Sequence, residues 1–281
     1  MFLGNRPIGI FDSGVGGLSV FKAIRQEKPA EQLIYLADQA HVPYGIRSLA
    51  EVRSYSEAIT RFLLDQGCKL IVVACNTASA AALLSLRKSF PQIHFVGMEP
   101  AIKPAAEVTR SGIVGVLATP ATFQGDLYAS VVERFANGVR LMQDTCPGLV
   151  SQIEAGQLES LETRKILTAA LRPMIDQGID TVVLGCTHYP FVIPLIQQIA
   201  GPTVRVIDPA PAVARQVGRL LEQNHLQYQE AEASVEDGRL KTQVKLFTTG
   251  ERDRFQELLP RLIDENWPVE LVHWKGNELF Y

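Results

Sequence analysis

Two cysteines stand at equivalent positions in two similar stretches of the chain. Cys186 ends the run TVVLGC and Cys75 ends the run LIVVAC, with about one domain's length of chain between them. Such short apolar runs are typical of buried parallel strands, and ligands of open α/β sheets bind beyond the carboxyl ends of these strands. A thiol at that place can serve as a nucleophile or as a base. The repeated pattern therefore predicts one functional cysteine from each half of the chain.

The residues that follow each cysteine support this interpretation. The alternative is a pair of buried structural cysteines, since free cysteine is among the most buried residue types. His188 has its own alternative as a satisfied structural histidine, but it lies two residues from a thiol in a strand-end loop, which favours a role in acid–base chemistry. The polar residues directly beyond the two cysteines are Asn76, Thr77, Thr187 and His188.

Composition bounds the class of protein. The chain has 281 residues, of which 47% are apolar and 20% charged, enough for a sizeable core and two ordinary domains. A net charge of −3 offers no electrostatic basis for binding nucleic acid or an anionic membrane. No apolar run approaches the roughly 20 residues of a membrane helix, and the first residues do not resemble a signal peptide. We therefore expect a cytoplasmic protein whose four cysteines stay reduced.

A glycine-rich turn follows the first expected strand. The strand covers residues 7–11, and DSGVGG at residues 12–17 leads into a helix over residues 18–26. Such a turn can cradle a phosphate, but Ser19 stands where the dinucleotide fingerprint requires its last glycine. A nucleotide site is therefore not favoured. Asp12 alone could be an N-cap or turn residue.

Apolar runs alternate with helical segments along the whole chain, which predicts an α/β fold with mostly parallel sheets flanked by helices. The stretch at 146–156 has the composition of a loop with a possible helical turn. Helices are expected at 48–66, 77–90, about 123–135, 159–177, 191–200, 210–224 and 252–263, and further strands at 32–37, 69–74, 93–97, 112–117, 139–143, 180–184, 203–207, 243–248 and 269–274.

The order of these elements predicts two similar domains. Glu99-Pro100 and Asp208-Pro209 have the composition of boundaries. We expect residues 1–99 to form a first α/β domain and residues 100–208 a second. Residues 209–281 have too little core for a domain of their own, so they should return to the first. The polar segment 227–241 is expected to be a surface loop or hairpin insertion.

Four motifs together carry a family resemblance. IGIFDSGVGGLSV near the start, PYG at 43–45, ACNTAS around Cys75 and GCTHYP around Cys186 resemble glutamate racemase, the cofactor-independent member of the aspartate/glutamate racemase superfamily. The motifs cover most of the chain in the family's order. The GCTH tetrad points to glutamate, because aspartate racemases carry an acidic residue where His188 stands. The insertion at 227–241 departs from shorter members but lies outside the motifs.

This resemblance implies two domains related by a pseudo-twofold axis, with the active site in the cleft between them. It implies that Cys75 and Cys186 are catalytic, that Asp12 assists Cys75, and that His188 assists Cys186 while Glu154 orients it. The residues matching the family's substrate-binding positions are Asp12, Ser13, Pro43, Tyr44, Gly45, Asn76, Thr77, Thr119, Thr122, Thr187 and His188, with Thr119 and Thr122 in a loop that grips the substrate carboxylate.

Racemisation at an α-carbon removes a proton from one face and delivers another to the opposite face, which two fixed thiols can do. The α C–H is a poor acid, so preorganised donors must stabilise the carbanion-like transition state. A free thiol with a pKa near 8.5 is only a few per cent thiolate at neutral pH, so each cysteine needs assistance. No motif demands a cofactor or a metal, and we expect none.

The resemblance further implies a homodimer that supplies D-glutamate for peptidoglycan and hence for cell wall and cell shape. Three other functions stay open. A related isomerase could act on another acid such as aspartate, which His188 argues against. A nucleotide- or effector-binding module would not depend on the cysteines. A metal or redox protein could use Cys186 and His188, but two ligands cannot complete a zinc site, and Cys68 and Cys146 show no paired spacing.

Overall fold

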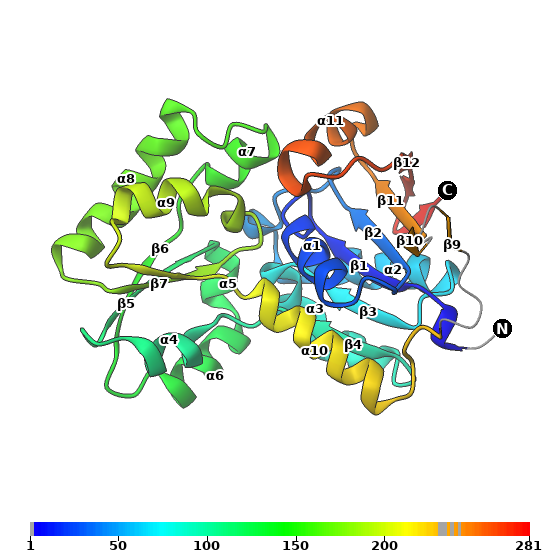
Figure 1. The fold of residues 1–281 in the computed structure, drawn as a ribbon, viewed down its shortest axis with the longest axis horizontal. Coiled ribbons are helices and arrows are strands. Elements are labelled where there is room, and N and C mark those ends of the chain that lie inside the picture. Colours follow the sequence, from blue (N-terminus) through cyan, green and yellow to red (C-terminus); the bar gives the residue numbers. More distant parts are fainter. Residues whose placement is uncertain (1–2, 230–234, 237–238, 241–242) are drawn as a thin grey trace.

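The structure is a computed structural model that describes residues 3–229, 235–236, 239–240 and 243–281. Figure 1 shows two lobes, each built around its own sheet. The large lobe holds a six-stranded sheet and the small lobe a four-stranded sheet, and helices flank both. The predicted α/β fold class is thereby confirmed. Most of the segment 227–241, expected to be a loop or hairpin, lies outside the described residues.

The large sheet is parallel throughout, in the order β12-β11-β2-β1-β3-β4. Strand β11 comes from the C-terminal part of the chain and lies beside β2, with Val244 opposite Leu33. The domain limits at residues 99 and 208 stay a prediction. The strands are β1 (Ile8–Asp12), β2 (Leu33–Ala37), β3 (Leu70–Val73), β4 (His94–Gly97), β11 (Val244–Thr248) and β12 (Val269–Leu271).

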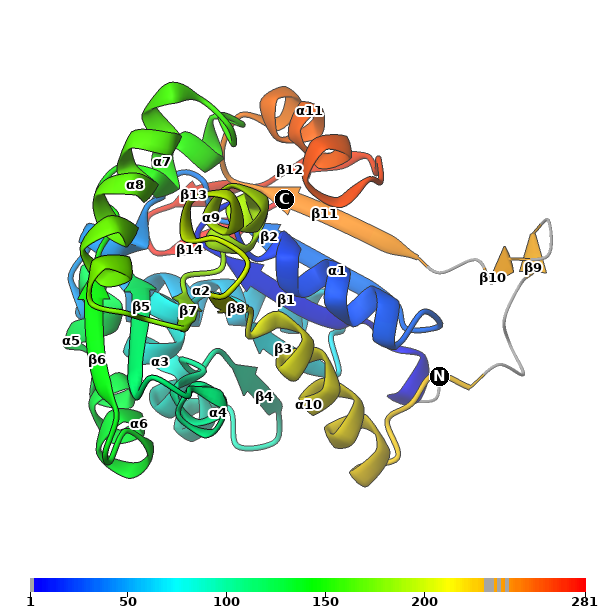
Figure 2. The ribbon, with the colours of Figure 1, turned by 60° about the vertical axis from the view of Figure 1, so that its left-hand side comes forward.

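The small sheet is also parallel, in the order β6-β5-β7-β8. Figure 2 shows the carboxyl ends of the large-sheet strands directed at the small lobe, so that the loops beyond these strands lie between the lobes. The strands are β5 (Ile113–Ala118), β6 (Arg140–Asp144), β7 (Thr181–Gly185) and β8 (Arg205–Ile207).

Helices cover both faces of the large sheet because its strands are apolar on both sides. Ile8 and Ile10 of β1 point into one hydrophobic cluster, and Phe11 points into another. Helices α1, α10 and α11 lie against one face, and α2 and α3 pack together on the other (Figure 1). The helices of this lobe are α1 (Leu18–Glu27), α2 (Leu49–Asp65), α3 (Asn76–Ser89), α10 (Ala210–Gln223) and α11 (Arg252–Ile263), with short 3-10 turns η1 (Leu3–Asn5) and η2 (Tyr44–Ile46).

The small lobe shows where sequence patterns misplace helices. The helix expected up to residue 135 is two helices, because Gly125 is extended and its position packs against Ala80 without room for a side chain. The stretch 146–156, expected to be a loop with a possible helical turn, contains a six-residue helix that begins after the left-handed Gly148. The helices are α4 (Ile102–Val108), which was not expected, α5 (Pro120–Gln124), α6 (Asp126–Phe135), α7 (Leu149–Glu154), α8 (Leu161–Asp176) and α9 (Ile193–Ala200), preceded by η3 (Tyr189–Val192).

The end of the chain also differs from the expected single strand. After β12 the backbone turns into a separate antiparallel hairpin, β13 (His273–Lys275) and β14 (Glu278–Phe280). Its Trp274 donates a hydrogen bond from Nε1 to Asp38 Oδ1 at 2.7 Å, and Asp38 follows β2 directly. Within the described part of the segment 227–241, β9 (Val235–Glu236) pairs antiparallel with β10 (Arg239–Leu240). None of the described helices has the length and apolar character to cross a lipid bilayer.

Candidate active site

Both predicted cysteines line one buried cavity between the lobes. Cys75 follows β3 and Cys186 follows β7, and each is only 5% exposed. The cavity has a volume of about 20 Å³, room for roughly one water molecule, so a larger ligand requires its walls to separate. Its lining consists of Ser13, Pro43, Tyr44, Gly45, Cys75, Asn76 and Thr77 from the large lobe and Thr119, Val150, Cys186, Thr187 and His188 from the small lobe.

Cys75 is the N-cap of α3 and has a carboxyl group as its partner. Its Sγ accepts a hydrogen bond from the backbone N–H of Ala78 at 3.4 Å. Burial raises the pKa of the Cys75 thiol well above its usual range, and the nearby Asp12 raises this pKa further. Burial also raises the pKa of Asp12, although the charge of His188 and several hydrogen bonds act against burial. Cys75 is therefore held as a thiol in this structure.

Cys186 has a different partner, an imidazole held by a carboxylate. His188 Nδ1 lies 3.8 Å from Cys186 Sγ, and His188 Nε2 lies 2.6 Å from Glu154 Oε1. Burial lowers the pKa of His188, but its hydrogen bonds and charge interactions with Cys186 and Glu154 outweigh burial, so this pKa lies well above its usual value. Burial raises the pKa of Glu154, but the bonds from His188 and others lower it overall. An imidazolium and a carboxylate thus stand behind Cys186.

The glycine-rich turn receives these carboxylates and does not form an open phosphate cradle. Asp12 accepts hydrogen bonds from the N–H groups of Ser13 at 2.7 Å and Gly17 at 2.6 Å. Glu154 accepts from the N–H of Val15 at 2.7 Å. A side chain at Gly14 would overlap Glu154. The N–H groups of Ser13, Val15 and Gly17 are therefore engaged. Gly14 and Gly16 permit the close approach of Glu154 and His188 from the small lobe.

Asn76 is the unusual polar group of the cavity. Its side chain is buried, and neither its Oδ1 nor its Nδ2 has a hydrogen-bond partner. A buried amide left unpaired costs about 1–3 kcal/mol, so such groups need an explanation. Asn76 lines the cavity beside Cys75, where a polar ligand would supply the missing partners.

Hydroxyl groups connect the two lobes around the cavity. Thr77 Oγ1 lies 2.9 Å from Thr119 Oγ1, which in turn lies 2.9 Å from Thr122 Oγ1. Thr187 Oγ1 donates to Asp12 Oδ2 at 3.3 Å. These contacts pair residues of the large lobe with residues beyond β5 and β7, so the site is complete only when the lobes meet.

The PYG turn is held by a buried aspartate. Asp38 accepts hydrogen bonds from Tyr44 Oη at 2.6 Å and from His41 Nδ1 at 2.9 Å. The Val42–Pro43 peptide bond is cis, and Gly45 lies against Thr119, with no space for a side chain between them. Asp38 therefore sets the position of Tyr44 at the wall of the cavity.

The structure brings the predicted site residues together, but some of them line the cavity and others lie behind its lining. Asp12, Glu154 and Thr122 do not line the cavity and instead lie behind Cys75, His188 and Thr119. Sequence reasoning missed Val150, Gln39 and Asp38. The four-residue spacing of Val150 from Glu154 on one helix is a signal that could have indicated Val150. In the described part of the chain, no group of three or more His, Cys, Asp or Glu residues could hold a metal ion.

Known proteins with this pattern identify the family. Residues 8–217 match the family model described as Asp/Glu/Hydantoin racemase. The chain belongs to the Asp/Glu/Hydantoin racemase family. A glutamate racemase from Roseiflexus sp. (strain RS-1) is 50% identical over 257 residues, 92% of each chain. The resemblance to glutamate racemase seen in the motifs is thereby confirmed, and the chain is an isomerase of the racemase type.

Solved glutamate racemases share the fold over nearly the whole chain. The structure of the Francisella tularensis enzyme with D-glutamate aligns with a TM-score of 0.80 and 29% identity, covering 96% of this chain and 98% of that chain. The Escherichia coli enzyme with L-glutamate and the activator UDP-MurNAc-ala aligns with a TM-score of 0.82 and 33% identity, covering 96% and 100%.

Proposed function

We propose that this racemase interconverts L- and D-glutamate by proton transfer at the α-carbon, with Cys75 and Cys186 as the two acid–base groups and without a cofactor. The observation that carries this proposal is the pair of buried thiols lining one cavity beside the unpaired amide of Asn76. Two fixed thiols allow removal and delivery of a proton on opposite faces with little motion, and polar groups around them stabilise developing charge.

The proton balance is simple. In the L to D direction, the α C–H bond breaks and its proton passes to the sulfur of Cys186. The electron pair stays on the α-carbon, and the thiol of Cys75 delivers its proton to the opposite face. In the reverse direction the two cysteines exchange roles. For this reverse direction Asp12 takes up the proton that Cys75 releases before it acts as a base, and the His188 imidazolium gives Cys186 the proton that Cys186 then delivers. In both directions His188 with Glu154 stabilises the thiolate form of Cys186.

Substrate recognition is assigned to the polar lining. We infer that Asn76, Thr77, Thr119 and Thr187 bind the charged groups of glutamate, together with Ser13 and the Pro43–Gly45 turn, with Thr122 acting through Thr119. Related enzymes were solved with D-glutamate and with L-glutamate, which supports glutamate as the substrate. Because the cavity holds roughly one water molecule, substrate entry requires the lobes to separate.

The cellular role follows from the reaction. D-glutamate is consumed in peptidoglycan synthesis, so we propose that the enzyme supplies this pathway and thereby supports cell wall formation and cell shape. We further propose a cytoplasmic homodimer. Equilibrium sedimentation of the purified protein tests the dimer.

A circular-dichroism assay tests the function. The purified protein, dialysed against EDTA and assayed without pyridoxal phosphate or nucleotide, should racemise both glutamate enantiomers faster than either aspartate enantiomer. Activity that disappears after dialysis and returns with a metal would overturn the proposal, as would a preference for aspartate.

A further inference from the structure

The carboxylate of Glu154 is held mainly by residues of the other lobe. Glu154 ends α7 in the small lobe, whereas two of its three hydrogen-bond donors, Val15 and Gln39, belong to the large lobe. Val15 N–H and His188 Nε2 bind Oε1, and Gln39 Nε2 binds Oε2 at 2.9 Å. Without Gln39, one oxygen of this largely buried carboxylate would have no protein donor among these contacts.

Gln39 is itself fixed in one orientation. It follows Asp38 at the end of β2, and its Oε1 accepts a hydrogen bond from Thr248 Oγ1 at 2.8 Å. This bond directs the amide nitrogen at Glu154. Gly250 leaves room for the Gln39 side chain, since a Cβ at Gly250 would lie 2.6 Å from that of Gln39. Strand β11 thus supports Gln39 from behind.

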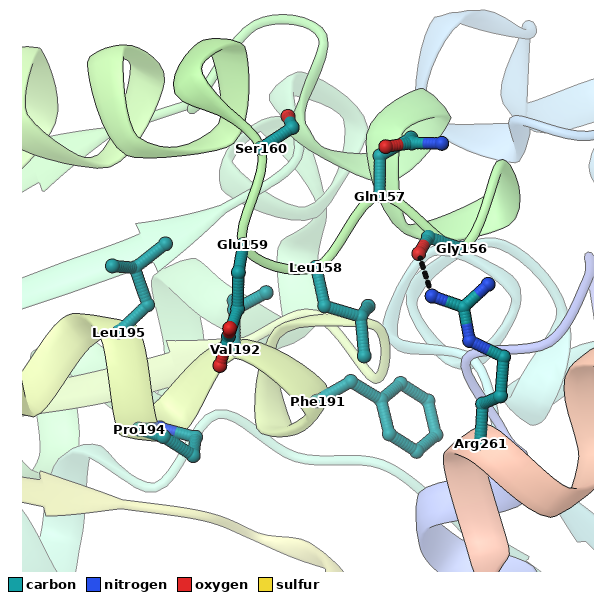
Figure 3. A pocket seen from close by; sticks show the side chains of 10 residues that line it. All are labelled: Gly156, Gln157, Leu158, Glu159, Ser160, Phe191, Val192, Pro194, Leu195 and Arg261. Atoms are coloured by element: carbon teal, nitrogen blue, oxygen red, sulfur yellow. Dashed lines mark hydrogen bonds between the residues drawn. The ribbon is translucent and has the colours of Figure 1, made fainter.

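Another contact fixes the backbone beyond Glu154. Figure 3 shows Arg261 of α11 reaching across to Gly156, whose carbonyl oxygen accepts a hydrogen bond from Arg261 Nη2 at 2.8 Å. The large lobe therefore contacts the end of α7 both at the carboxylate and two residues later.

We propose that Gln39, oriented by Thr248, is a positioning residue for the Cys186 side of the reaction: it holds Glu154 in the geometry that directs His188 at Cys186. Gln39 does not line the cavity, so it acts through Glu154 and not on the substrate. This inference rests on the proposed two-cysteine racemisation and names a residue that the motifs did not indicate.

The charges around Glu154 determine the sign of the expected pH effect. His188 pairs with the carboxylate of Glu154, and the charge of His188 also interacts with Asp12. The pKa of Tyr35 is raised by burial and then by the charges of Asp12 and Glu154. Arg261 binds the backbone carbonyl of Gly156 nearby. The hydrogen bond from Gln39 lowers the pKa of Glu154. Removal of this bond therefore raises that pKa, and a step that needs the ionised carboxylate becomes active only at higher pH.

The direct test is Gln39→Leu, compared with Gln143→Leu. Gln143 also donates one side-chain hydrogen bond, to Tyr128 Oη at 2.7 Å, but lies on β6. Loss of a hydrogen bond to a charged group corresponds to about tenfold or more in rate. We expect Gln39→Leu to lower kcat about tenfold, to change KM for glutamate by less than about twofold, and to move the acid limb of kcat to higher pH. Gln143→Leu should change none of these.

A second pair of variants separates positioning from general loss of structure. Thr248→Val removes the hydroxyl that orients Gln39 with little change in volume, and Thr248→Ser keeps it. The valine variant should show a smaller decrease in kcat with the same direction of pH shift, and the serine variant should restore the wild-type profile. If the Gln39→Leu protein is folded and active but the acid limb of its kcat–pH profile matches that of the wild type, the proposed role of Gln39 is wrong. Absence of glutamate racemisation in the wild type would instead overturn the proposed function.

Discussion

The two cysteines occupy matching places in two sheets, but their surroundings differ in charge. Burial raises the pKa of the Cys75 thiol, and the carboxyl group of Asp12 that faces Cys75 raises it further. Cys186 faces the imidazole of His188, which Glu154 holds at 2.6 Å. A carboxylate disfavours a neighbouring thiolate and an imidazolium favours it. One side is therefore arranged to hold a proton and the other to receive one.

This difference fits the roles that the proposed mechanism gives to the two cysteines. In the proposed mechanism, the form with a protonated Cys75 is the one in which Cys186 takes a proton from L-glutamate and Cys75 delivers one to form D-glutamate. In the same mechanism, the reverse direction first requires Asp12 to accept the proton of Cys75 and His188 to give one to Cys186. Under this proposal, the neighbouring side chain determines whether a cysteine after a parallel strand starts as acid or as base.

Replacement of either cysteine should have the largest effect. Cys75→Ser and Cys186→Ser should each lower racemisation in both directions by at least about 10²-fold, since a general base contributes about 10²–10⁴-fold. A substrate such as N-hydroxyglutamate tests each cysteine separately. Removal of its α-proton and departure of its hydroxide as water leave an imine, and this elimination needs only one base. Cys75→Ser should spare elimination from the L form, and Cys186→Ser from the D form. Equal loss of both eliminations in both variants would contradict the assignment.

Asp12→Asn should change the Cys75 side with a defined sign. The charge of Asp12 contributes to the raised pKa of Cys75, so its removal lowers that pKa. The acid limb of elimination from the D form should move to lower pH, and its maximal rate should fall about tenfold because the proton acceptor is lost. The measurement is a pH profile with each enantiomer. A shift confined to the L form would show that Asp12 serves Cys186 instead.

Gly14→Ala should affect the Cys186 side through packing. The added methyl group would overlap Glu154, so it must displace this carboxylate from Val15 and weaken its hold on His188. We expect a several-fold decrease in kcat, with elimination from the L form slowed more than from the D form. The control is Gly178→Ala. No atom lies within 4 Å of the Cβ position at Gly178, but its φ of +84° disfavours any side chain. This variant should therefore lose stability without any effect on the site.

The residues after the two cysteines should differ in their effect on stability. Asn76 has no partner, whereas Thr187 donates a hydrogen bond to the buried Asp12. Asn76→Ala should raise the unfolding free energy by about 1 kcal/mol and the Tm by about 2 °C while activity falls, because an unsatisfied amide is removed. Thr187→Val should lower the Tm by a similar amount. Thermal unfolding without substrate measures both, and a lower Tm for Asn76→Ala would show that its amide has a partner in solution.

Much of this site could be predicted from the chain because its signals are local. An apolar run followed by Cys75 or Cys186 places each thiol at a strand end without knowledge of the rest of the fold. No local sequence pattern indicates a role for Gln39, since that role depends on contacts with Glu154 and Thr248, which lie far away in the sequence. The helix α7 was expected only as a possible helical turn, because a six-residue helix after a left-handed glycine has too few turns to show a period.

The glycines of the turn at residues 12–17 have a structural reason other than phosphate binding. Gly14 and Gly16 fit two positions of a phosphate-binding fingerprint. In the structure their lack of side chains makes room for Glu154 and His188, which come from the opposite lobe. Only the approach of the two lobes reveals this reason, and the local pattern of glycines does not show which residues of the other lobe come close.

The late position of β11 in the chain has a consequence for synthesis on the ribosome. Strand β2 leaves the ribosome early but pairs on one side with β11, and Asp38 receives its bond from Trp274 near the end of the described chain. At about 5–20 residues per second, the nascent large lobe waits on the order of ten seconds or more for these partners. The four strands of the small lobe follow one another without such a gap. We therefore expect the small lobe to be the first folded unit of the nascent protein, and the edge of β2 to be the surface that a chaperone would cover until β11 has been synthesised.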